Sequence, residues 1–143
     1  MVHHSLTKDS ETVSWGAIER YHIETNRWRN IGYHAGVELV GSPSSLGRYA
    51  YQALIGRPLH SHAAACPQGG MNELALHVCC VGNFDLAPPS DELLRVLIRR
   101  VLLPWMFEFS VPPSRVVGHH DYNPEKTCPG TKFDLARLRA MLT

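Results

Sequence analysis

A loop near the C-terminus combines side chains that could bind a metal ion and carry out hydrolysis. Between Gly118 and Gly130 it holds an imidazole at His119, a thiol at Cys128 and an ammonium group at Lys126. A structural zinc site usually takes four protein ligands, whereas a catalytic site takes three and leaves a position open for water. The chain has no Cys-X-X-Cys motif, so the loop predicts a hydrolytic zinc site whose third ligand comes from a distant segment.

The start of the chain offers the missing imidazole. His3 and His4 stand side by side there, and either could complete a site with His119 and Cys128. Most histidines in proteins are ordinary hydrogen-bonded residues. Taken alone, the residue types therefore leave both a metal site and a plain loop open.

The ligand types define the chemistry that such a site would support. Two neutral imidazoles and one thiolate leave a charge of about +1 on a zinc centre, which can lower the pKa of bound water to about 7. Attack on an amide carbonyl creates an oxyanion, which the Lys126 ammonium could stabilise. Tyr33 could orient the water or protonate the leaving nitrogen. A solvated loop lysine and a core aromatic are the alternative interpretations of these two residues.

Five more segments extend the pattern along the chain. Together with the loop from Gly118 to Gly130 they are Val2-His3-His4-Ser5, Gly32-Tyr33-His34, Gly56-Arg57, Ser61-His62-Ala63 and Val78-Cys79-Cys80-Val81-Gly82. In this order they resemble the type 2 N-acetylmuramoyl-L-alanine amidases, the zinc-amidase family of phage endolysins and peptidoglycan recognition proteins. The resemblance implies Zn²⁺ as cofactor, peptidoglycan or a muropeptide as substrate, and an α/β fold with a mixed central β-sheet flanked by helices.

Carried over residue by residue, the resemblance also implies a ligand set. It makes His3 the first zinc ligand, His119 the second and Cys128 the third, and it gives His4 the place of a variable neighbour. The loop between the second and third ligands is one residue longer than in many relatives, which leaves His120 as an alternative to His119. Only two residues precede His3, so the strand that carries it is expected to be short, frayed or held by its neighbours.

Five further residues are candidates on the catalytic and substrate side. The resemblance assigns catalytic roles to Tyr33 and Lys126. His62 lies in a loop that should pass over the site, where it could contact the substrate or could be an ordinary loop residue. Arg57 could pair with a substrate carboxylate or with a nearby acidic side chain. Asn72 is placed with the substrate-binding residues, where we expect it to fix the conformation of the loop.

Three helices are expected from apolar periodicity and capping residues. One runs from Ser14, its N-cap, to about residue 25. The second begins at Ser90 and should be kinked or ended by Pro104. Asp134 can cap a closing helix that turns leucines inward.

Strands are expected at residues 33–40, 48–55, 74–81 and 115–118. The first two form a hairpin around the turn-rich residues 41–47. Residues 74–81 are nearly continuously apolar, which predicts a central strand covered on both faces. The last strand would deliver His119 to the sheet edge, and His34 should lie on the sheet face opposite Tyr33, in a structural role.

Composition fits one domain spanning residues 1–143 and excludes several function classes. Lys and Arg number 14 against 13 Asp and Glu, which argues against nucleic acid and anionic membranes as partners. No apolar run approaches the roughly 18 residues of a membrane span, and no signal peptide is recognisable. The four cysteines lack the spacing of a disulfide framework. We expect a monomer that is cytoplasmic before lysis and then acts on the cell wall.

The predicted function is that of a phage or prophage endolysin cutting the amide between N-acetylmuramic acid and L-alanine. One alternative is a cytoplasmic amidase that recycles wall fragments. Another is a non-catalytic peptidoglycan-binding recognition module, against which the retained Cys128 argues. In a third, zinc only stabilises the fold, which would require a fourth ligand from His4 or His120.

Overall fold

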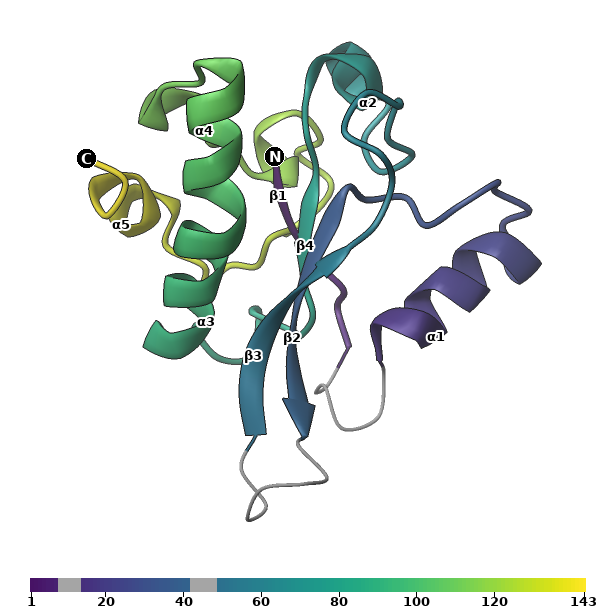
Figure 1. The fold of residues 1–143 in the computed structure, drawn as a ribbon, viewed down its shortest axis with the longest axis horizontal. Helices are drawn as coiled ribbons and strands as arrows, with labels where there is room; N and C mark the ends of the chain where they lie inside the picture. Colours follow the sequence, from purple (N-terminus) through teal and green to yellow (C-terminus); the bar gives the residue numbers. More distant parts are fainter. Residues whose placement is uncertain (8–13, 42–48) are drawn as a thin grey trace.

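A four-stranded mixed sheet forms the centre of the molecule (Figure 1). The computed structural model describes residues 1–7, 14–41 and 49–143, so the predicted turn at 41–47 lies almost entirely outside the described residues. The strands follow the order β1-β4-β2-β3, with bounds β1 Val2–His4, β4 Val78–Cys80, β2 Ala35–Gly41 and β3 Tyr49–Ile55. The first three are parallel and β3 is antiparallel to β2. Helices cover both faces, which confirms the expected fold class.

Strand β1 has three residues and is held in place from both sides. Its pairing with β4 sets His3 opposite Cys79, and the Val2 amide donates to the Val117 carbonyl at 2.8 Å. The Met1 amino group donates to the Leu76 carbonyl at 2.6 Å. The expected short strand is therefore an ordered part of the sheet.

A long helical run packs on one sheet face. It comprises α3 (Asp91–Leu97), a π-helical turn η3 (Ile98–Leu102) and α4 (Leu103–Phe109). Ser90 caps it by accepting from the Leu93 amide at 3.1 Å. Of the two predicted effects of Pro104, a kink or an end, the end is wrong. The run continues to Phe109 because the hydrogen bonding widens to i−5 spacing just before Pro104, with the Leu103 amide donating to the Ile98 carbonyl.

The opposite face is covered by α1 (Trp15–Arg20) and a π-helical turn η1 (Tyr21–Thr25), in agreement with the predicted helix. Ser14 caps α1 by accepting from the Ala17 amide at 3.2 Å. The Trp15 ring packs against Gly36, where a Cβ atom would come within 2.4 Å of the ring. Glycine at this position therefore lets the tryptophan pack directly on the sheet.

Two predicted strands are wrong in extent. Residues 74–81 do not form one strand, because the short helix α2 (Met71–Leu74) follows the 3-10 turn η2 (Gln68–Gly70) and the strand begins only at Val78. Leu74 is 77% exposed, so the apolar run does not enter the core as a unit.

Residues 115–118 form no strand either. The 3-10 turn η4 (Pro113–Arg115) is followed by extended backbone that meets β1 in one bridge, between Gly118 and Val2.

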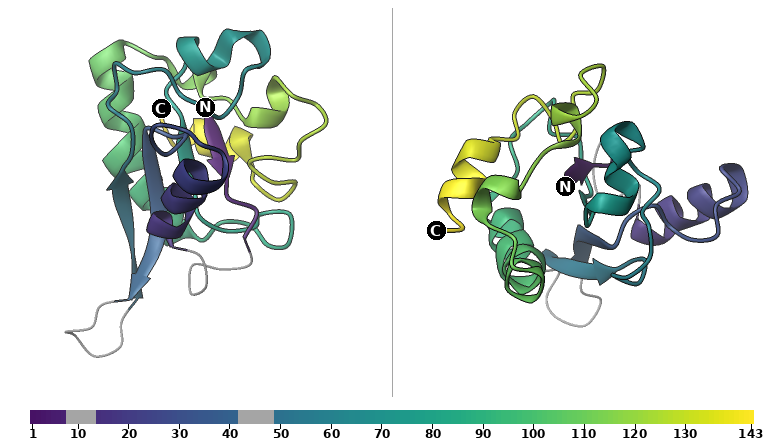
Figure 2. Two further views of the ribbon diagram at one scale, coloured as in Figure 1. Left: turned by 90° about the vertical axis from the view of Figure 1, so that its right-hand side faces the viewer. Right: turned by 90° about the horizontal axis from the view of Figure 1, so that it is seen from above.

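The closing helix α5 (Leu135–Ala140) is capped as predicted, since Asp134 accepts from the Arg137 amide at 2.8 Å. Its buried side chains, Leu135 and Leu138, belong to the same core cluster as the buried leucines of α3. Figure 2 shows α2, the N-terminus and the 118–130 loop gathered at one end of the sheet. No helix of the described ranges is long and apolar enough to cross a membrane.

Candidate metal centre

Three side chains from distant parts of the chain converge at this end of the sheet. One ligand atom each from His3, His119 and Cys128 lies within 4.8 Å of the others. The Cys128 Sγ is 3.5 Å from His3 Nδ1, and the two imidazole rings are 4.8 Å apart in an edge-on arrangement. The bridge between Val2 and Gly118 produces this convergence, because it sets β1 beside the 3-10 turn η5 (His119–Asp121).

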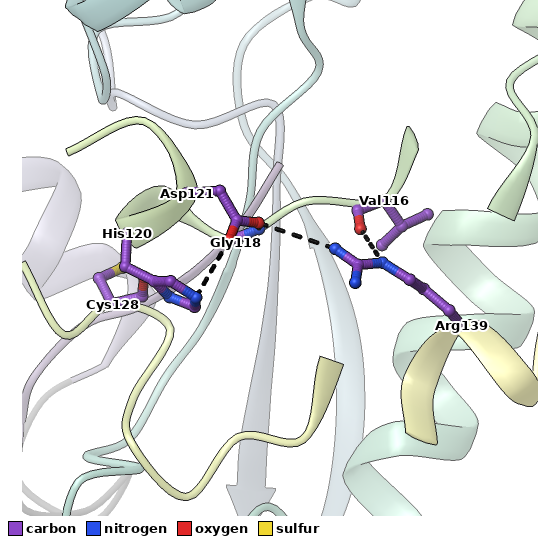
Figure 3. Close-up of polar contacts among 6 residues, drawn as sticks. All are labelled: Val116, Gly118, His120, Asp121, Cys128 and Arg139. Carbon is purple, nitrogen blue, oxygen red and sulfur yellow. Dashed lines mark hydrogen bonds and ion pairs between the residues drawn. The ribbon is translucent and has the colours of Figure 1, made fainter. Parts of the chain in front are cut away.

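The neighbouring histidines, His4 and His120, face elsewhere. The His4 Nδ1 accepts from the Phe84 amide at 3.3 Å, on the other side of the strand. His120 Nδ1 lies 3.0 Å from the Cys128 carbonyl oxygen, and its Nε2 lies 3.2 Å from Asp121 (Figure 3). Within the described residues the cluster therefore holds three donors, and neither neighbour supplies a fourth.

The loop that carries two of the three donors is anchored to α5. Asp121 Oδ2 accepts from the Gly118 amide at 2.9 Å and lies 3.7 Å from the Arg139 guanidinium (Figure 3). The same guanidinium donates to the Val116 carbonyl at 2.8 Å. These contacts hold the backbone on the N-terminal side of His119 in a fixed conformation.

The donor set fits zinc. The His119 Nε2 is buried and has no hydrogen-bond partner within the described part of the chain, although buried polar atoms are nearly always paired. Two imidazoles and one thiolate are ligands that zinc prefers. Zinc bonds of about 2.0–2.3 Å in tetrahedral geometry bring ligand atoms to roughly 3.5 Å from one another, which the separation of Cys128 Sγ and His3 Nδ1 matches.

Burial sets the charge state of all three donors. It lowers the pKa of His3 well below its usual value, and nearby His77 and His119 lower it further. Burial, followed by the Lys126 charge, lowers the pKa of His119. Burial raises the pKa of the Cys128 thiol to about 12, although the His4 amide that donates to its sulfur opposes this shift. Without a bound cation, both imidazoles are neutral and the sulfur is a thiol.

These shifts predict that zinc binding releases protons. Near pH 7 the imidazoles have none to lose and the thiol must ionise, so the ligands should release about one proton per zinc bound, in addition to any proton lost by a zinc-bound water. The affinity for zinc should rise about tenfold per pH unit on going up from pH 7. Calorimetric titration in buffers of different ionisation enthalpy measures the proton count. Zinc binding without proton release would contradict thiolate ligation.

The two residues predicted to be catalytic lie near the cluster. The Tyr33 ring is 5.2 Å from the His3 ring, on the sheet face covered by α1. Burial, together with neighbouring Cys79 and Cys128, raises the pKa of Tyr33 well above its usual value. Lys126 is exposed, and its charge acts on the pKa of His119. It also lines a surface hollow with His120 that includes none of the three donors.

Arg57 and Asn72 hold the loop that contains His62. The Arg57 guanidinium donates to the carbonyls of Ile31, Asn30 and His62, and not to an acidic side chain of the described residues. The Asn72 amide oxygen accepts from two successive loop amides, at Ala65 and Cys66, both at 2.8 Å. The Asn72 contacts fit the loop-fixing role expected of that residue, and the exposed His62 side chain is free to face solvent.

Two further buried histidines surround the site. His34 is structural as expected, since its Nε2 donates to the Ser61 carbonyl and its Nδ1 accepts from the His77 amide at 3.0 Å. His77 is fully buried, and burial lowers its pKa to about 4. It contacts His3 directly although no motif marks it. The sequence feature that could have identified His77 is its position as a single polar residue within an apolar run, directly before a strand.

The sequence matches a family model described as N-acetylmuramoyl-L-alanine amidase over residues 1–131. A comparison with curated proteins found no significant match.

Among solved structures, the chain is similar to N-acetylmuramoyl-L-alanine amidase LysC from Clostridium intestinale URNW. The TM-score is 0.74 at 21% identity, with 99% of this chain and 81% of that chain covered. Wild-type PGRP-LB from Drosophila has a TM-score of 0.72 at 18% identity, with 99% and 76% covered. PGRP-SA from Apis mellifera has 0.70 at 19%, with 92% and 75% covered. At these identities the likeness establishes the fold.

Proposed function

The chain belongs to the N-acetylmuramoyl-L-alanine amidase family, and we propose that it is a zinc-dependent enzyme. Its substrate is peptidoglycan or a muropeptide, and it hydrolyses the amide between N-acetylmuramic acid and L-alanine. The observation that carries the proposal is the cluster of His3, His119 and Cys128, which offers three zinc-preferring donors and no fourth among the described residues. Three ligands are what a hydrolytic zinc requires.

A role as a phage or prophage endolysin is the biological form of this proposal. It is supported by the likeness to LysCS from Clostridium intestinale URNW, which is described as an endolysin amidase. The wall-recycling amidase and the non-catalytic recognition module remain the alternatives to be separated by experiment. Because the chain is also similar to PGRP structures, any test must be able to detect a non-catalytic recognition module.

In the proposed mechanism, Cys128, His3 and His119 would hold a zinc ion, which would supply the Lewis acidity that activates water for attack on the amide carbonyl. The Lys126 ammonium stabilises the negative charge that develops on the carbonyl oxygen. The Tyr33 hydroxyl is protonated at neutral pH, like any tyrosine of ordinary or raised pKa, so it can donate a hydrogen bond to the leaving nitrogen and help to protonate it.

On the substrate side, we assign a supporting role to two of the three predicted residues. The Arg57 guanidinium donates to backbone carbonyls, one of them at His62, and the Asn72 amide oxygen accepts from the Ala65 and Cys66 amides of the same loop. The exposed His62 side chain is the one that this loop presents. We therefore propose that His62 contacts the muropeptide and that Arg57 and Asn72 hold it in place.

Tyr33→Phe is expected to lower turnover by about a hundredfold or more, because it deletes a proton donor and keeps the ring. Zinc content and thermal stability should stay near those of the unaltered protein, since the ring still packs beside Trp15 and His3. The measurements are kcat on a purified muropeptide, metal analysis and a thermal melt. Hydrolysis at the original rate would return Tyr33 to the role of a core aromatic.

The function itself is tested on purified bacterial cell walls. Clearing of turbidity, with new L-alanine amino termini appearing in step, is expected with zinc and should stop when a chelator is added. Sedimentation of the protein with the walls in the absence of new amino termini would support the recognition module instead. Hydrolysis that persists after complete zinc removal would overturn the metal-dependent mechanism.

A further inference from the structure

A buried histidine outside the donor cluster, His77, links the metal centre to the backbone of α2. The His77 Nδ1 lies 2.8 Å from His3 Nε2, and its Nε2 lies 2.8 Å from the Met71 carbonyl oxygen. The His3 and His77 ring planes make an angle of 23° and the ring centroids are 5.0 Å apart, whereas the facing nitrogens are only 2.8 Å apart, so these nitrogens point toward each other. Because the lone pair of an imidazole nitrogen lies in the ring plane, this geometry suits a hydrogen bond between the rings.

The partners of His77 determine where the protons lie. A carbonyl oxygen only accepts, so the His77 Nε2 facing Met71 carries a proton. The ring is fully buried and neither nitrogen contacts a carboxylate, which favours a neutral ring with a single N–H. The His77 Nδ1 is then an acceptor, and the N–H between the two rings belongs to His3 Nε2.

The tautomer of His3 determines whether its Nδ1 atom is free to bind a metal ion. A neutral His3 protonated on Nε2 has a free lone pair on Nδ1, which is the nitrogen 3.5 Å from Cys128 Sγ. The opposite tautomer would set two lone pairs against each other across the contact with His77 and would point a proton into the donor cluster. The hydrogen-bonded chain from Met71 through His77 therefore favours the one form of His3 that can bind a cation.

We propose that His77 is a positioning residue of the metal centre, which fixes the tautomer and ring orientation of the ligand His3 through a relay anchored on the Met71 carbonyl. The proposal rests on the zinc site of the proposed function. Hydrogen bonds to the remote nitrogen of a ligating histidine commonly change metal affinity by about 10–100-fold. The same relay ties α2 and its preceding glycine turn to the metal centre.

Hydrogen bonds of the His77 backbone also hold this residue in place. Its backbone amide donates to His34 Nδ1, and His34 Nε2 donates to the Ser61 carbonyl. The carbonyl of His77 accepts from the His34 amide at 2.8 Å. His77 is therefore held through both its main chain and its side chain, as expected of a group that must hold another in place.

The first test reads the protons directly in the metal-free protein. Nitrogen-15 NMR of the imidazoles should show His3 protonated on Nε2, with that proton protected from exchange by its bond to His77. In His77→Leu this protection should be lost. A His3 protonated on Nδ1 in the unaltered protein would overturn the relay. This result does not depend on catalysis, so it separates failure of the relay from failure of the proposed function.

The second test measures zinc affinity by competition with a chelator. His77→Leu removes the acceptor and should weaken binding by about 10–100-fold. His77→Asn places an amide oxygen where Nδ1 stood and should recover most of the affinity. Cys66→Ser, a change at another fully buried residue that packs near Met71, is the matched control and should bind zinc normally.

Unchanged affinity in a folded His77→Leu protein would overturn the proposal, as would equal weakening in all three variants. If His77→Leu does not fold, the NMR result on the unaltered protein and the recovery in His77→Asn decide the question. If the unaltered protein binds no zinc, the proposed function fails, while the protonation of His3 still reports on the relay.

Discussion

Replacing Cys128 with serine is expected to empty the metal centre and abolish amide hydrolysis. The thiolate is the one anionic donor of the set, and its removal leaves two neutral imidazoles to hold a dication. Metal analysis of the unaltered protein should give about one zinc per chain, and the variant should give almost none after dialysis. Release of L-alanine amino termini should fall to the level of a protein-free control.

Cys66→Ser is the matched control for this experiment. Cys66 is also buried and free, but its sulfur faces Gln68 and not the donor cluster, so zinc content and activity should be retained. His4→Ala and His120→Ala test the alternative ligands and should also keep zinc. Full occupancy in Cys128→Ser, together with loss in either histidine variant, would show that the ligand assignment is wrong.

Lys126→Ala is expected to keep its zinc and to lose about a hundredfold or more in kcat. Removing one preorganised donor to a developing oxyanion typically costs on the order of 3 kcal/mol of transition-state stabilisation. The ammonium acts where charge develops and not in the ground state, so KM should change much less than kcat. Steady-state kinetics on a purified muropeptide with zinc-saturated protein measure both parameters.

Lys132→Ala controls for the loss of a positive charge in the same segment. Lys132 is exposed and lines the same surface hollow, but its ammonium donates to the Leu86 carbonyl at 2.7 Å. Its replacement should leave kcat close to that of the unaltered protein. An unchanged kcat in zinc-loaded Lys126→Ala would make Lys126 a solvated loop residue and would leave the chemistry to zinc and Tyr33.

The sequence was enough to predict features that depend on residues a few positions apart, such as helix caps. Ser14, Ser90 and Asp134 each accept a hydrogen bond from the amide three residues ahead, which is why the predicted helix starts are confirmed. The same locality explains the failure at residues 74–81. An apolar run does not reveal where the chain leaves a helix and enters a sheet, and here the strand starts only at Val78.

The choice between neighbouring histidines needed the tertiary structure. Alternation along a strand predicts that His3 and His4 point to opposite faces, but it does not identify the face that meets the loop. The pairing of β1 with β4 and its bridge to Gly118 place His3 in the donor cluster and turn His4 toward Phe84. In the same way, the hydrogen bonds of the loop turn His120 toward the Cys128 carbonyl and away from the cluster.

Residue types and local spacing were therefore enough to predict the family resemblance, the fold class, the helix caps and the residue types of the candidate metal centre. Only the tertiary structure brings the three donors within 4.8 Å of one another and places the His77 side chain in contact with His3. The physical reason is distance along the chain, since 74 residues separate His77 from His3 and 125 separate Cys128 from His3. Spacing and periodicity describe neighbours in sequence, whereas these contacts exist only once the parallel strands have paired.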